Sequence, residues 1–507
     1  MKKQAFNPFL PLEAYIPDGE PHIFGSRVYL YGSCDKEGGE TFCMGDYTVY
    51  SAPVDDLSDW RCEGVIYSAK QDPDYRERPY MYAPDVVRGN DGRYYLYYCM
   101  SGAFGVGGYF GPISVAVCDT PAGKYEYLGC VRYPDGSPMK KYVCFDPCAF
   151  NDGGVIRLYY GTQYQGESND VLARDEEKLT NVMERYNKSR EEVLGTPDNV
   201  NGACMAVLEN DMLTVKSEPQ HIIPYEADFG GHEFFEASSM RKVGDKYYFV
   251  YSSQKNHELC YAVSDRPDGG FAFGGTIVSN GDVGIDGRSD SDRLNMTGTT
   301  HGSIIEINGQ WYVFYHRLTH KSDYSRQACA ERIRIASDGS ISQVEMTSCG
   351  LNGAPLIGRG SYPAVIACNI SNGHMPHGSN RIYAESFPNV THSNFSDTAL
   401  GADLEDGGVS RYTDRYIGEI SDGTLIGFKY FSFENVKSIS LTVRGQGSGV
   451  IQVHTAMEGE PVCTVPISPA ENWTEFSSEL SFHDGVFPVY LVFRGDGMIE
   501  LKDIAFE

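Results

Sequence analysis

Basic residues are scarce in this chain. Its 507 residues include 42 Lys and Arg against 69 Asp and Glu, which gives a formal net charge of −27. A surface of that charge repels phosphate backbones and anionic lipid headgroups, so we expect neither nucleic acid nor a membrane as a partner. No run of about 18 apolar residues is present, and the amino terminus lacks the apolar core of a signal peptide. The sequence therefore predicts a cytoplasmic protein.

Paired cysteines are also lacking. The 14 cysteines are scattered singly, and the closest two, Cys144 and Cys148, lie on either side of Asp146-Pro147 rather than forming a Cys-x-x-Cys motif. Closely spaced cysteine pairs are the usual signature of thiolate metal sites, and disulfide frameworks belong to oxidising compartments. The sequence thus predicts buried free thiols.

Tyrosine, glycine and proline are abundant, with 36, 56 and 25 copies. Such a composition is typical of short strands joined by tight turns. A strand rich in tyrosine or other apolar residues recurs five times, spaced about 65 residues apart except for one longer interval of about 90. The markers of these strands are Tyr29, Tyr95, Tyr159, Tyr248 and Tyr312. Strand repeats of this length predict a five-bladed β-propeller.

An acidic residue or a histidine precedes the tyrosine-rich strand in every repeat. These residues are Glu20, Asp85, Asp146, Glu236 and His301. Each stands at the head of the first strand of its repeat. Closure of the five repeats into a ring would therefore bring them to one site at the axis.

The pattern changes near residue 375. A passage rich in Gly, Ser, Asn and His, from Ser371 to Asn380, is typical of a linker, and alternating apolar and polar strands follow it. We therefore predict an all-β protein with the propeller in residues 1–375 and a jelly-roll-like β-sandwich in residues 376–507. The longer interval between repeats contains a stretch of helical spacing over residues 170–194, which predicts a surface helix.

The five axial motifs resemble glycoside hydrolase family 43. They read Pro-Asp18-Gly-Glu20-Pro, Tyr-Ala-Pro-Asp85, Phe-Asp146-Pro, Phe-Phe-Glu236-Ala-Ser and His301-Gly-Ser, in the order that this family uses. The C-terminal part resembles a family 6 carbohydrate-binding module through Ile-Tyr-Ala-Glu385, Tyr416-Ile-Gly-Glu-Ile-Ser-Asp-Gly423 and Leu501-Lys-Asp-Ile-Ala-Phe. The resemblance implies an inverting hydrolase of arabinose- and xylose-containing glycans.

Three carboxyl groups carry the chemistry that the resemblance implies. Glu236 corresponds to the general acid, and Asp146 to the residue that raises the pKa of that acid. The general base is open between Asp18, which has the Pro-Asp dipeptide, and Glu20, which has the favoured distance from the next strand. A base and an acid that lie far enough apart to admit a water molecule invert the anomeric centre.

Aromatic and charged residues near these motifs are candidates for sugar binding, because sugar rings present apolar faces and polar rims. The candidates are Phe24, Tyr82, Phe235 and Arg293. No cofactor is needed for the chemistry, and the resemblance implies that His301 helps to hold a structural cation, such as calcium, near the propeller axis.

The expected substrate is a small oligosaccharide derived from arabinoxylan or arabinan. We predict an exo-acting α-L-arabinofuranosidase, with β-D-xylosidase as the alternative within the same family. A non-catalytic carbohydrate-binding propeller is the alternative of another class. The oligomeric state is not predicted by the sequence.

Overall fold

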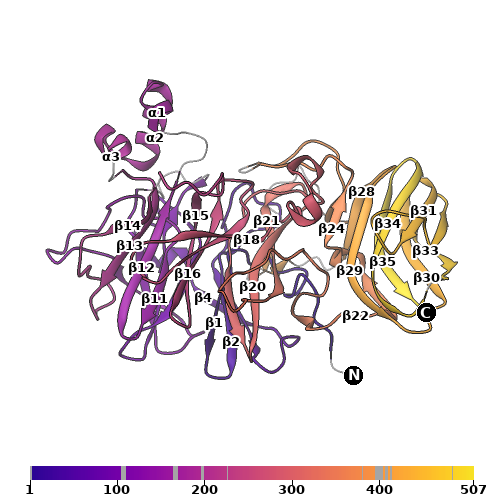
Figure 1. Cartoon of the computed structure of the whole chain (residues 1–507), viewed down its shortest axis with the longest axis horizontal. Coiled ribbons are helices and arrows are strands. Elements are labelled where there is room, and N and C mark those ends of the chain that lie inside the picture. Colours follow the sequence, from indigo (N-terminus) through magenta and orange to yellow (C-terminus); the bar gives the residue numbers. More distant parts are fainter. Residues whose placement is uncertain are drawn as a thin grey trace.

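The computed structural model shows two β-rich regions side by side, with strands β1 to β21 in one and the C-terminal strands in the other (Figure 1). The structure describes residues 3–103, 110–163, 169–195, 199–224, 226–378, 381–393, 404–405, 409–410, 414–481 and 483–507. Among these residues no helix has the length and apolar character needed to cross a bilayer.

The first region contains five antiparallel sheets that follow one another along the chain. The first comprises β1 (Glu20–Phe24), β2 (Arg27–Tyr31), β3 (Tyr47–Pro53) and β4 (Arg61–Tyr67). The second comprises β6 (Asp85–Arg88), β7 (Tyr94–Tyr98), β9 (Ser114–Cys118) and β10 (Glu126–Cys130). Strands β5 (Tyr80–Met81) and β8 (Met100–Ser101), which flank β6 and β7 in the sequence, form a separate two-stranded sheet. The third comprises β11 (Cys148–Asp152), β12 (Val155–Thr162), β13 (Gly202–Leu208) and β14 (Gln220–Pro224). The fourth comprises β15 (Phe234–Val243), β16 (Lys246–Ser253), β17 (Leu259–Ser264) and β18 (Ala272–Val278), and the fifth β19 (Ser303–Ile307), β20 (Gln310–Thr319) and β21 (Ser322–Ile333).

The first strands of the five sheets form a closed ring. Strand β1 contacts β6 and β19, β6 contacts β11, β11 contacts β15, and β15 contacts β19. All five marker tyrosines lie on the second strand of their sheet, namely β2, β7, β12, β16 and β20. The predicted five-bladed propeller is therefore confirmed, and the heads of its inner strands meet around one axis.

A helical insertion follows the second strand of the third blade and stands out from the propeller (Figure 1). It comprises α1 (Asn169–Leu172), α2 (Glu176–Tyr186) and α3 (Arg190–Leu194), where a single surface helix was predicted. The side chain of Asp175 caps α2 by accepting a hydrogen bond from the Lys178 backbone N–H. Leu179 and Tyr186 are buried in one apolar cluster with Tyr82 and other propeller residues. Buried apolar contacts therefore anchor the base of the insertion to the propeller.

The second region is a β-sandwich of two sheets. One sheet comprises β22 (Leu356–Ile357), β24 (Asn369–Ser371), β29 (Leu425–Phe433), β31 (Ser448–His454), β32 (Cys463–Ile467) and β34 (Gly485–Asp496). The other comprises β23 (Gly360–Pro363), β25 (Asn389–His392), β28 (Arg415–Ile420), β30 (Ser438–Gly445), β33 (Ala470–Glu479) and β35 (Ile499–Phe506). Strands β26 (Leu404–Glu405) and β27 (Val409–Ser410) pair only with each other. Phe428, Phe431 and Ile504 are among the residues that fill the core between the sheets.

The sandwich begins earlier than the boundary predicted between residues 375 and 376. Strands β22 and β24 pair with β29, and β23 pairs with β35, although all three precede that boundary. Strands of two to four residues are too short to show alternation in the sequence. The Gly- and Ser-rich passage therefore resembled a linker although residues on both sides of it belong to the sandwich.

Two groups of buried ion pairs join the propeller to the sandwich. Glu37 of the first blade lies 3.1 Å from Arg415 Nη2 of β28 and accepts a hydrogen bond of 2.8 Å from His320. Lys429 of β29 lies 2.9 Å from Asp282 and 2.8 Å from Glu345. Buried charges are retained only where they are paired, so these contacts fix the sandwich against the propeller.

Candidate active site

Glu236 is presented by a distortion of the first strand of the fourth blade. Strand β15 pairs with β16, but the register shifts both before and after Glu236. The next residue, Ala237, has a φ of +69°, in the left-handed region that non-glycine residues seldom adopt. Bulges of this kind re-aim a side chain. Glu236 is half-buried, in contrast to the buried residues that follow it.

Asp146 accepts a hydrogen bond from the backbone of the same distorted segment. It precedes β11 with a φ of +43°, and its Oδ2 accepts a hydrogen bond of 3.1 Å from the backbone N–H of Ala237. Burial and the nearby charge of Asp18 outweigh the opposing effect of His301 and raise the pKa of Asp146 to about 7. Asp146 therefore both holds the backbone beside Glu236 and places a titrating carboxyl group next to it.

Asp18 occupies a strongly cationic environment. Its Oδ1 accepts a hydrogen bond of 2.8 Å from Arg326 Nη1 of β21, and its Oδ2 accepts one from the hydroxyl of Ser33. Burial raises the pKa of Asp18, but Arg326, His316 and His301 together lower it below its ordinary value. Asp18 is consequently ionised at neutral pH.

Glu20 is the first residue of β1 and is already neutralised by a cation. Its Oε2 accepts hydrogen bonds of 2.7 Å from Arg241 and 3.1 Å from the Ser239 hydroxyl, both on β15. An ion pair with a guanidinium and a hydroxyl contact satisfy one of its oxygens fully. Glu20 therefore serves as a bridge between the first and fourth blades.

His301 lies between two of these carboxylates. Its Nε2 is 3.8 Å from Glu20 Oε1 and its Nδ1 is 3.8 Å from Asp146 Oδ2. Burial lowers the pKa of His301, but Glu20, Asp146 and Asp18 raise it to about 9. The imidazole is thus a cation at neutral pH and balances the acidic residues at the axis.

The carboxyl groups divide into two kinds at neutral pH. Burial, followed by the charges of Asp146 and Asp18, raises the pKa of Glu236 well above its ordinary value, so it keeps its proton. Asp18 has lost its proton, because its pKa is lowered. A protonated and an ionised carboxyl group held at one site are the acid and base that glycoside hydrolysis requires.

Two of the predicted sugar-binding residues, Phe24 and Tyr82, pack against other aromatic rings. Phe24 lies at the far end of β1, about 13 Å along the strand from Glu20 at roughly 3.3 Å per residue, and its ring packs edge-on against Tyr94 at 4.9 Å. The prediction for Phe24 is therefore wrong, because the strand carries it away from the carboxyl groups. Tyr82 is buried, with its ring 5.5 Å from that of Phe145, and supports the residue before Asp146.

The other two candidates belong to a line of residues beside Glu236. Phe235 is half-buried and its ring meets His257 edge-on at 4.7 Å. The ring centroids of His257 and His377 are 6.2 Å apart. Burial and the charge of Arg293 lower the pKa of His377. The histidines were not predicted, because a single histidine in a loop gives no signal of its neighbours.

Arg326 and Arg241 were also missed. Each carries a charge into a strand that is otherwise largely buried, in β21 and β15. A charged residue within such a strand does indicate a buried partner. The partner itself is more than 200 residues away in the chain, so the spacing within a repeat could not identify it.

Comparison with known proteins agrees with this geometry. Residues 17–341 match the family of proteins described as glycosyl hydrolases family 43. A xylosidase/arabinosidase of Thermoclostridium stercorarium is 44% identical over 521 residues, covering 99% of this chain and 98% of that protein. Xylosidase/arabinosidase 43A of Humicola insolens is 30% identical over 346 residues, covering 64% of this chain and 96% of that protein.

Among solved structures, the GH43_1 enzyme of Xanthomonas citri complexed with xylotriose has the same propeller fold. The TM-score is 0.50 at 24% identity, covering 65% of this chain and 91% of that one. Fold, site and sequence similarity therefore agree, and the chain belongs to family 43 of the glycosyl hydrolases.

Proposed function

We propose that the protein is an inverting exo-glycosidase that releases terminal α-L-arabinofuranosyl residues from short oligosaccharides. The observation that carries this proposal is the opposite protonation of two carboxyl groups at one site, Glu236 with a raised pKa and Asp18 with a lowered one. A protein that only bound sugars would gain nothing from this difference.

In the proposed reaction a water molecule attacks the anomeric carbon and transfers a proton to Asp18. The bond between that carbon and the glycosidic oxygen breaks, its electron pair stays on the oxygen, and Glu236 donates a proton to it. Asp146 contributes in two ways, through its charge and through its hydrogen bond to the Ala237 N–H. Both carboxyl groups return to their starting states by proton exchange with solvent.

Asp18 is a better candidate for the base than Glu20. A base must be ionised to accept a proton from water, and the pKa of Asp18 is lowered by Arg326, His316 and His301 against the opposing effect of burial. The charge of Asp18 also contributes to the raised pKa of both Asp146 and Glu236. Replacing Asp18 by Asn and Glu20 by Gln, one at a time, tests the choice, because added azide should restore turnover only where the base has been lost.

The identity of the sugar is tested directly with two aryl glycosides. We expect hydrolysis of nitrophenyl α-L-arabinofuranoside, and the alternative activity is hydrolysis of nitrophenyl β-D-xyloside, since two relatives are named xylosidase/arabinosidase.

Glu236→Gln should lower kcat on either substrate by about 1,000-fold or more, while Glu306→Gln on the exposed face of β19 should not. Proton NMR of the first product should show the inverted anomer.

Absence of activity on both glycosides, or full activity of Glu236→Gln, would overturn the proposal. A retained anomer would overturn only the inverting mechanism. Activity on short oligosaccharides in preference to polymer is the outcome expected if the predicted cytoplasmic location is right, and cell fractionation tests that location.

We propose, from the family resemblance, that a calcium ion can be held near His301, which lies 3.8 Å from both Glu20 Oε1 and Asp146 Oδ2. Carboxylate oxygens are the ligands that calcium prefers. Turnover measured with and without a chelator tests whether calcium contributes.

For the sandwich we propose a structural role in preference to the carbohydrate binding that its sequence resemblance implies. Tyr416 is buried, and the guanidinium of Arg444 covers the ring of Trp473 at 4.3 Å, so neither ring offers an open face on that side. Affinity electrophoresis in arabinoxylan gels decides between the roles, since Trp473→Ala should leave the mobility unchanged.

A further inference from the structure

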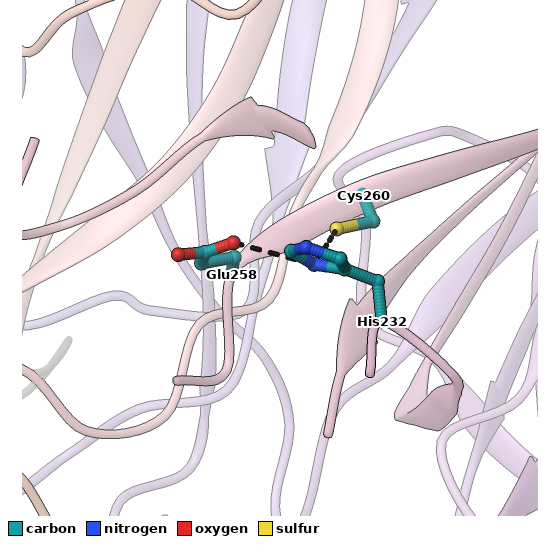
Figure 2. Close-up of side chains that lie close together, drawn as sticks. All are labelled: His232, Glu258 and Cys260. Carbon is teal, nitrogen blue, oxygen red and sulfur yellow. Dashed lines mark hydrogen bonds and ion pairs between the residues drawn. The ribbon is translucent and has the colours of Figure 1, made fainter. Parts of the chain in front are cut away.

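A second group of ligand-type side chains lies in the fourth blade, outside the acid and base site. It consists of His232, Glu258 and Cys260, which point toward one another in Figure 2. Glu258 immediately precedes β17 and Cys260 is the second residue of that strand, so the two side chains project to the same face. His232 comes from the loop before β15.

The distances within this group match those around a tetrahedral zinc ion. The Sγ of Cys260 is 3.6 Å from Nδ1 of His232, and the same nitrogen is 3.4 Å from Oε2 of Glu258. Tetrahedral zinc with ordinary bond lengths places a sulfur and a nitrogen ligand about 3.6 Å apart, and a nitrogen and an oxygen about 3.3 Å apart. These two separations therefore fit a tetrahedral zinc ion, and all three ligand atoms lie within 4.8 Å of one another.

The surrounding residues hold the three ligands in place. The hydroxyl of Thr276 on β18 lies 3.2 Å from Glu258 Oε2 and 3.5 Å from Cys260 Sγ. The imidazole of His232 stacks on Phe273 with ring centroids 5.2 Å apart, and its backbone carbonyl accepts a hydrogen bond of 2.6 Å from Tyr251. Fixed orientation of the ligands by neighbouring groups is a regular feature of metal sites.

The exposure of the group fits a metal that enters from solvent and is then held. The side chain of His232 is 17% exposed, whereas that of Glu258 is 4% exposed and Cys260 is buried. A thiolate and a carboxylate would neutralise both charges of a zinc ion. Mixed sulfur, nitrogen and oxygen ligands favour zinc over calcium or magnesium, which take oxygen ligands.

We propose that His232, Glu258 and Cys260 bind one zinc ion, with a water molecule as the fourth ligand. The ion joins the loop before β15 to the head of β17, across the intervening strand β16. Because Glu236 follows His232 by four residues on the same segment, the ion also fixes the approach of the chain to the general acid. This role is structural and does not depend on the proposed glycosidase activity.

The test is metal content and metal binding by the full-length protein purified without a histidine tag. We expect about one equivalent of zinc after incubation with zinc chloride and gel filtration, measured by atomic emission. Replacement of zinc by cobalt should produce the near-ultraviolet absorption of a thiolate–cobalt bond and the visible bands of tetrahedral cobalt. Zinc should raise the Tm of the wild-type protein, and a chelator should reverse the rise.

Variants separate this site from adventitious thiol binding. Cys260→Ser should abolish the thiolate–cobalt absorption, and His232→Gln, at the partly exposed ligand, should weaken zinc binding by more than about 100-fold. Cys62→Ser removes an exposed thiol and Cys329→Ser a buried one, and both should bind zinc as the wild type does. Circular dichroism confirms that each variant is folded.

Two results would overturn the proposal. One is a wild-type protein that retains no zinc after gel filtration. The other is a zinc content that is lost in Cys62→Ser and kept in Cys260→Ser and His232→Gln. Either outcome leaves the three side chains as a hydrogen-bonded group with no metal, and neither affects the assignment of Glu236 as the acid.

Discussion

Replacement of Asp146 by Asn should make the protein more stable in neutral and alkaline solution while it impairs turnover. The pKa of Asp146 is about 7 in the folded protein, against an ordinary value of 3.8. Below pH 4 the group is protonated in both the folded and the unfolded chain, so it has no effect on stability there. Between pH 4 and 7 only the unfolded chain loses the proton, and the free energy of unfolding falls as pH rises.

The magnitude follows from the size of the shift. A difference of about 3 pKa units corresponds to about 4 kcal/mol of unfolding free energy, fully expressed above pH 7. Asn carries no proton and can still accept the hydrogen bond from the Ala237 N–H, so the variant should escape this loss. We expect the Tm of Asp146→Asn to exceed that of the wild type by several degrees at pH 8 and to equal it near pH 4.

Asp18→Asn is the matched control, because folding shifts the pKa of Asp18 in the opposite direction to that of Asp146. The pKa of Asp18 is lowered in the folded protein, so its contribution to stability is present above pH 4 and is lost as pH falls through the folded-state pKa. This variant should therefore melt below the wild type at neutral pH. Scanning calorimetry or fluorimetry over pH 4–8 measures both, and parallel profiles for the wild type and Asp146→Asn would refute the reasoning.

Three further expectations follow from the same contacts. The wild-type kcat/KM should fall on the alkaline side as the general acid loses its proton, and a profile flat to pH 10 would contradict the raised pKa of Glu236. Arg326→Lys keeps the charge but loses the guanidinium fork, so kcat should fall about 10- to 100-fold, whereas the exposed Arg332→Lys should match the wild type in the same assay. Arg415→Met removes the guanidinium that pairs with the buried Glu37, so the free energy of unfolding in denaturant titration should fall by about 3–5 kcal/mol. Arg444 pairs with Glu500 within the sandwich and provides the control. An equal loss in Arg444→Met would argue against a specific role of the interface.

The repeats in the sequence predicted the propeller well because each blade is a local unit. Tyr29 and the corresponding tyrosines mark the second strand of every blade, and that register located Glu236 and Asp146 at the axis. The same register predicted Phe24 wrongly, because a position four residues along an inner strand lies far from the strand head. Local pattern therefore identifies a strand more reliably than it places the individual side chains along it.

The choice between Asp18 and Glu20 depended on contacts that no local pattern contains. Arg326 of the fifth blade pairs with Asp18, and Arg241 of the fourth blade pairs with Glu20. The composition of residues 371–380 likewise indicated a linker, because the strands that tie this part to the sandwich are too short to show a period. Packing between distant segments determined both features.

Strands β22 to β24 also bear on how such two-part proteins arise. A module that could be exchanged between genes would begin after its neighbour has ended, yet here the sandwich draws three strands from the stretch that closes the propeller. Transfer of residues 376–507 to another protein would remove β22 and β24 from the side of β29, and β23 from the side of β35. A boundary that preserves every strand of the sandwich must therefore fall before Leu356.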